Sequence, residues 1–79
     1  MQDDNTIIAS VKLLISRLEH LSADSRYAHR ASGLRGSLWR CVEKLEAGQA
    51  IGLPQLERLM AQGYEILVAA AREINAPEK

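Results

Sequence analysis

The sequence has few of the residues that build reactive or base-stacking sites. Its 79 residues contain one cysteine, two prolines and no phenylalanine. A single cysteine excludes an internal disulfide and a cysteine-based zinc site, and it suits a reducing compartment. The aromatic residues are Tyr27, Trp39 and Tyr64, which are too few to expect a surface that stacks nucleic-acid bases.

The chain also lacks net charge. Ten basic and ten acidic residues cancel, so no overall field attracts the protein to nucleic acid or to an anionic membrane. No apolar run approaches the roughly 18 residues of a membrane span, and the acidic start Met1-Gln2-Asp3-Asp4 differs from the basic start of a signal peptide. We therefore expect a cytoplasmic protein whose electrostatic interactions are local.

Motifs for catalysis, cofactors or metals are missing as well. His20 and His29 fall on different predicted helices, with no third ligand at a helical spacing from either. Cys41 lies among apolar residues, where a thiol is a poor nucleophile. Glu43 and Glu46 have the spacing of an ordinary exposed helical pair. We expect neither an enzyme nor a cofactor or metal site.

What the sequence does contain is three amphipathic segments, separated by small polar residues around 22–25 and by glycine and proline around 48–54. Within each segment apolar residues recur at spacings of three and four, which is typical of a helix with one buried face. We predict helices at roughly 5–22, 24–47 and 54–75. Ser22 or Asp24 would cap the second helix, and Gly48 would end it in a left-handed conformation.

The buried faces follow from the same spacing. The first comprises Ile7, Val11, Leu14, Ile15, Leu18 and Leu21; the second Tyr27, Ala31, Leu34, Leu38, Cys41, Val42 and Leu45; the third Leu56, Leu59, Met60, Gly63, Ile66, Leu67, Ala70 and Ile74. Short connections favour antiparallel neighbours, so we predict an all-α, up-down-up three-helix bundle that forms a single domain over residues 1–79. A chain this short buries only about 60% of its unfolded surface, and a partner subunit would add stability.

The segment Ser32-Gly33-Leu34-Arg35-Gly36-Ser37 conflicts with the otherwise regular second helix. Two interior glycines cost about 2 kcal/mol relative to alanine. The helix could break here, with Ser37 capping a fourth helix, but the unbroken apolar phase from Tyr27 to Leu45 favours a continuous helix. In a continuous helix, small residues beside Trp39 would let another backbone approach closely, either that of a neighbouring helix or that of a binding partner.

The same helix is locally basic. Arg26, Arg30, Arg40 and Lys44 project to one side of it, around Gly33. Such a face is either ordinary solvated surface, a contact for an acidic protein, or a contact for nucleic-acid phosphates. The segment lacks Asn and Gln, the common readers of adenine. The predicted partner-binding residues are Arg26, His29, Arg30, Gly33, Gly36, Ser37, Trp39 and Arg40.

The third segment is apolar over a wider arc than one buried face requires. Tyr64 and Ala71 widen the face, Val68 lies further round, and Leu13 is likewise off the main face of the first helix. Scattered exposed aliphatic residues are normal, but a homodimer interface would also explain them. The leading hypothesis is a non-catalytic protein-interaction module, homodimeric, that binds another macromolecule through its second helix. The partners considered are a second copy of the chain and an acidic protein. The alternative is a small nucleic-acid-binding or regulatory protein that uses the basic face.

Overall fold

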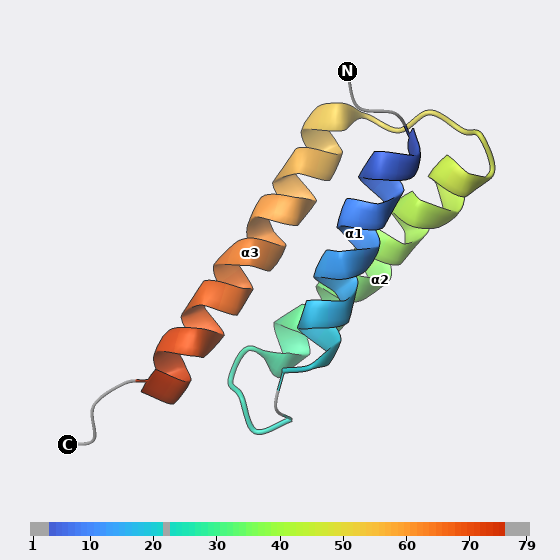
Figure 1. Cartoon of the computed structure of the whole chain (residues 1–79). Helices are drawn as coiled ribbons and strands as arrows, with labels where there is room; N and C mark the ends of the chain where they lie inside the picture. Colours follow the sequence, from blue (N-terminus) through green and yellow to red (C-terminus); the bar gives the residue numbers. More distant parts are fainter. Residues whose placement is uncertain (1–3, 22, 76–79) are drawn as a thin grey trace.

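Three helices form an antiparallel bundle in the computed structural model, which describes residues 4–21 and 23–75 (Figure 1). The helices are α1 (Asp4–Glu19), α2 (Ala28–Glu46) and α3 (Leu53–Asn75), and each contacts the other two. Within the described ranges no residue lies in a strand. The predicted up-down-up three-helix bundle is confirmed.

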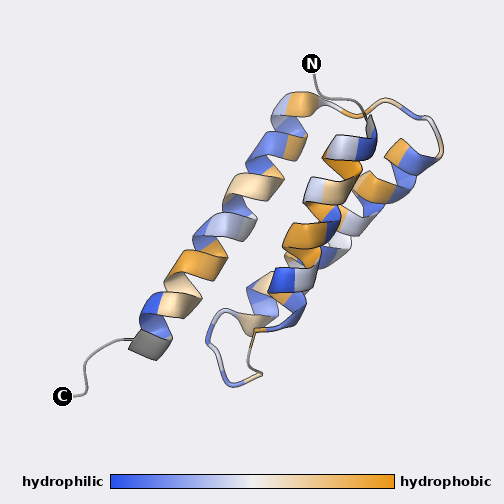
Figure 2. Cartoon of the chain, viewed as in Figure 1, coloured by the Kyte–Doolittle hydropathy of each residue, from blue (hydrophilic) through white to orange (hydrophobic). Residues whose placement is uncertain are grey.

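The core consists of the apolar stripes that the sequence spacing predicts. Hydrophobic and hydrophilic residues alternate along each helix in Figure 2, as amphipathic packing requires. The buried hydrophobic residues are Val11, Leu14, Ile15 and Leu18 of α1, Ala31, Leu34, Leu38, Cys41 and Val42 of α2, and Leu56, Ile66 and Ala70 of α3. All of them belong to the predicted faces. The side chain of Ile74 lies outside the described part.

Both ends of the first connection differ from the prediction. α1 ends at Glu19 rather than at residue 22, because the chain tightens after it: His20 N–H donates to the Arg17 carbonyl at 3.2 Å, and Leu21 N–H donates to the Leu18 carbonyl at 3.3 Å. These bonds span three residues, as in the 3₁₀ turns that often end α-helices.

α2 begins at Ala28, four residues later than predicted. The predicted caps were wrong: Asp24 lies in the connecting turn, Ser22 is outside the described residues, and the residue before the helix, Tyr27, makes no side-chain capping bond. Instead Ser25 organises this turn, because its Oγ accepts a hydrogen bond from Tyr27 N–H at 3.1 Å and donates to Glu73 Oε1 at 2.7 Å. The start of α2 therefore depends on a contact with α3.

The end of α2 confirms the prediction for Gly48. This glycine has φ of +80°, a left-handed conformation that other residues adopt only at a cost. Gly48 N–H donates to the Leu45 carbonyl at 3.1 Å, and Gln49 N–H donates to the Lys44 carbonyl at 2.9 Å. This pair of bonds is a Schellman motif, which satisfies carbonyls that the helix end would leave unpaired.

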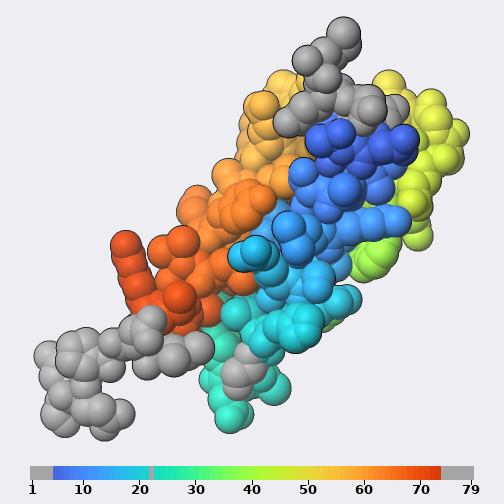
Figure 3. Space-filling model, viewed as in Figure 1, coloured from blue at the N-terminus to red at the C-terminus, as the bar shows by residue number. Residues whose placement is uncertain are grey.

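α1 and α3 approach each other closely at Gly63. A Cβ atom placed on Gly63 would lie 2.8 Å from Leu14 Cδ2, which is too short for carbon atoms in contact. The two helices lie against each other on the face of the molecule seen in Figure 3. Gly63 is thus the glycine that brings two helices of the bundle together.

None of the three helices, within the described part, is long and apolar enough to cross a bilayer.

Candidate interaction surface

α2 runs without a break through its glycine pair. The helix extends from Ala28 to Glu46, so the alternative of a fourth helix beginning near Ser37 is wrong. A Cβ atom placed on Gly33 or Gly36 would meet no atom of a neighbouring element within 4 Å. Gly33 and Gly36 therefore do not receive α1 or α3, and the interpretation that this glycine pair packs against a neighbouring helix is also wrong.

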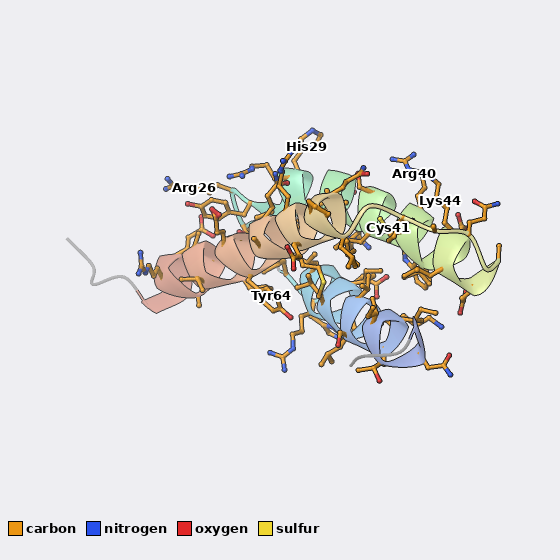
Figure 4. All side chains as sticks on the ribbon, turned by 90° about the horizontal axis from the view of Figure 1, so that it is seen from above. Arg26, His29, Arg40, Cys41, Lys44 and Tyr64 are labelled. Carbon is orange, nitrogen blue, oxygen red and sulfur yellow. The ribbon has the colours of Figure 1, made fainter. Side chains whose placement is uncertain are left out.

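The glycine pair lies at the centre of the outer face of α2. This name denotes the half-buried Ser37 and the solvent-facing residues of the helix except Glu46, which pairs with α1: His29, Arg30, Ser32, Gly33, Gly36, Ser37, Trp39, Arg40, Glu43 and Lys44. Seven of the eight residues predicted to bind a partner belong to it. Figure 4 shows His29, Arg40 and Lys44 extending away from the bundle along one edge of the molecule.

Arg26 is the exception among the predicted site residues. It lies in the turn before α2, and Figure 4 places it near the opposite end of the helix from Arg40 and Lys44. Its Nε donates to Glu73 Oε2 at 3.1 Å, and its backbone N–H donates to the same oxygen at 3.2 Å. The prediction that Arg26 continues the basic row of α2 is therefore wrong, because the chain is not yet helical there and its guanidinium faces α3.

Glu73 holds the first connection against α3. Its carboxylate receives the Ser25 hydroxyl and both donors of Arg26. The Ser25 hydrogen bond is the main reason that the pKa of Glu73 lies below the ordinary glutamate range, and the bonds and charge of Arg26 lower it further against an opposing effect of burial. We call Ser25, Arg26 and Glu73 the Glu73 clamp. The Glu73 carboxyl group is therefore ionised at neutral pH, where it can accept these hydrogen bonds.

A second arginine is paired on the flank of α2 that faces α1. Arg35 Nη1 lies 3.5 Å from Glu19 Oε2, and near the other end of the helix Glu46 Oε2 accepts a hydrogen bond from Lys12 Nζ at 3.0 Å. These pairs tie α2 to α1. Sequence spacing did not indicate them, because each joins residues of different helices.

The remaining cations of α2 form a row on its outer face. Arg30, Arg40 and Lys44 are exposed, and no residue of 4–21 or 23–75 forms an ion pair with them. Arg30 and Arg40 are ten residues apart, about 15 Å along the helix, with the glycine pair between them. Trp39 lies about one helical turn beyond Arg35, on the flank of α2 that faces α1, and is 42% exposed. The face can contact anions and offers one large apolar side chain.

Metal binding is a further function to consider for the described residues. In the described part of the chain, no three His, Cys, Asp or Glu side chains are placed together to hold a metal ion. Comparisons with protein families, curated proteins and solved structures give no match.

A separate apolar surface lies between α1 and α3. Leu13, Leu53, Tyr64 and Val68 are 57%, 58%, 50% and 52% exposed, so the residues by which the sequence widens the apolar face of the third helix include two that lie largely outside the core, Tyr64 and Val68. Leu13 precedes the residue that packs on Gly63, and Tyr64 follows Gly63. Because α1 and α3 run parallel and each residue turns the helix by about 100°, these two side chains project to the same side, opposite α2. Figure 4 agrees, since Tyr64 extends away from the labelled basic residues.

Proposed function

We propose that this chain is a non-catalytic protein-interaction module that binds an acidic protein surface through the outer face of α2. The observation that carries the proposal is the open glycine pair within a row of unpaired cations. Gly33 and Gly36 cost about 1 kcal/mol each relative to alanine, and no contact inside the described protein offsets that cost. The close approach of a partner's backbone between Arg30 and Arg40 would offset it.

An acidic protein suits this face better than nucleic acid does. Only three unpaired cations lie on the outer face of α2, Glu43 lies on the same face, and the net charge of the protein is zero, so the attraction to a phosphate backbone is weak. Trp39 adds an aromatic side chain of the kind enriched at the centre of protein interfaces. Nonspecific phosphate binding is the second candidate function, supported by the same cation row.

Charge reversal tests the proposal. We expect fluorescein-labelled poly-L-glutamate to bind the native protein at low ionic strength, and Arg40→Glu with Lys44→Glu to weaken binding by at least about tenfold. The matched control is Arg58→Glu with Arg72→Glu, which makes the same charge change at exposed positions of α3. Equal losses in the two double variants would contradict a role for this face. Tighter binding of a labelled DNA duplex than of poly-L-glutamate would favour the nucleic-acid function instead.

We further propose that the module is a homodimer joined through the apolar surface between α1 and α3. Large exposed side chains on one side of two parallel helices are typical of a surface that another subunit covers. Light scattering at micromolar concentration should give twice the chain mass, and Tyr64→Glu should return the protein to a monomer. A monomeric native protein would refute the dimer.

The single free thiol of Cys41 suits a cytoplasmic location.

A further inference from the structure

A hollow of about 280 Å³ lies beside the cation row, where α2 faces the beginning of α3. Its inner wall is apolar: Cys41 and Leu56 are buried and Leu59 is half-buried. Its rim is polar, since Arg40, Lys44 and Gln55 are exposed. Figure 4 shows this layering, with Arg40 and Lys44 reaching outward and Cys41 closer to the bundle.

The size and chemistry of the hollow limit what fits it. Pockets for whole small-molecule ligands usually measure about 300–1,000 Å³, so this hollow suits one bulky side chain rather than a complete ligand. An apolar wall favours an aliphatic or aromatic group. Arg40 and Lys44 at the mouth make no ion pair with any described residue, and they favour carboxylates next to that group.

We propose that the hollow receives a bulky apolar side chain of the acidic partner, while carboxylates flanking that side chain contact Arg40 and Lys44. This inference rests on the proposed function and specifies the partner: an acidic segment with an embedded leucine, methionine or aromatic residue. Such an anchor resembles the side chains that dominate binding energy in protein interfaces, which sit in desolvated pockets ringed by polar contacts.

A pair of peptides provides the test. One is a labelled peptide of alternating Asp and Glu with a central Phe, and the other has Ala in place of Phe. Burial of the ring should make the Phe peptide bind roughly tenfold to hundredfold tighter in fluorescence anisotropy. The Phe peptide should also slow the reaction of Cys41 with a thiol reagent more than the Ala peptide does, because Cys41 lies on the wall of the hollow.

Two matched variants locate the effect. Ser37 lines the hollow and Ser32 does not, although both lie on the outer face of α2. Leucine is a better helix former than serine, so neither Ser37→Leu nor Ser32→Leu should unfold the helix. We expect Ser37→Leu to fill the hollow and abolish the difference in affinity between the Phe and Ala peptides. Ser32→Leu lies on the binding face and can weaken both peptides alike, but it should preserve the ratio of their affinities.

The outcomes separate this inference from the proposed function. If both peptides bind equally and charge reversal at Arg40 and Lys44 weakens both, the acidic partner stands and the anchor is refuted. If neither peptide binds at low ionic strength, both ideas fail. If the Phe peptide binds tightly in the charge-reversed variant, the hollow is an apolar site that does not require carboxylates, and the inference is overturned.

Discussion

Replacing a glycine by alanine should stabilise the protein on the outer face of α2 but not at the contact between α1 and α3. At Gly33 and Gly36 an added methyl group meets no neighbouring element within 4 Å. The only expected effect is the gain in helix propensity, about 1 kcal/mol for each substitution. The double variant should gain about 2 kcal/mol, which for a domain of this size raises the melting temperature by about 8–16 °C.

At Gly63 the same gain in propensity is opposed by a steric clash. The new Cβ would lie 2.8 Å from Leu14 Cδ2, and Leu14 is only 1% exposed, so its side chain has little room to move. Overpacking of this kind typically costs about 1–3 kcal/mol. Gly63→Ala should therefore be neutral or destabilising by up to about 2 kcal/mol.

Urea denaturation followed by far-UV circular dichroism measures all three variants on one scale. Gly33→Ala and Gly36→Ala should unfold at higher urea concentrations than the native protein, and Gly63→Ala should not. A Gly63→Ala variant as stabilised as the other two would refute the close contact between Gly63 and Leu14. Destabilisation by Gly33→Ala would show that this glycine makes an internal contact.

Other perturbations test the core, the clamp and the surface pairs. Leu38→Ala should cost about 2–5 kcal/mol in urea denaturation, because Leu38 is completely buried; a loss below about 1 kcal/mol would contradict its place in the core. The Glu73 clamp should stabilise the fold fully above the ordinary glutamate pKa of about 4.3, and this stabilisation should be lost as the pH falls through the lowered pKa of Glu73. Glu73→Gln should therefore flatten the dependence of the unfolding midpoint on acid pH. Parallel pH profiles for the two proteins would argue against the clamp. Lys12→Met should change stability by less than about 1 kcal/mol, because its pair with Glu46 is exposed, and a larger loss that persists in high salt would show another role for Lys12.

Local sequence patterns were sufficient for the three helices and, to within one residue, for all of their ends except the two at the first connection. The apolar spacing within each segment predicts its buried face, because the side chains that share a core face recur with the helical period. Gly48 could be predicted because the left-handed helix end depends only on its immediate neighbours.

Features that depend on residues far apart in the chain could not be predicted. The start of α2 and the pairing of Arg26 both depend on Glu73, and Ser25 meets it across 48 positions of the sequence. The apolar spacing places Gly63, but not Gly33 or Gly36, on a buried face, yet it does not show that Leu14 of α1 is the residue that packs on Gly63. The hollow beside Cys41 lies between α2 and the beginning of α3, so it too depends on residues that are distant in the sequence.

The central claim is that the outer face of α2 binds a partner whose backbone approaches closely at Gly33 and Gly36. Gly36→Leu tests it most directly, with poly-L-glutamate affinity and urea stability measured on the same protein. Leucine at this open position should increase helix stability, while its bulk should keep the partner from approaching between the cations. We predict a more stable protein whose affinity falls by at least about tenfold. Increased stability with unchanged affinity would contradict the account.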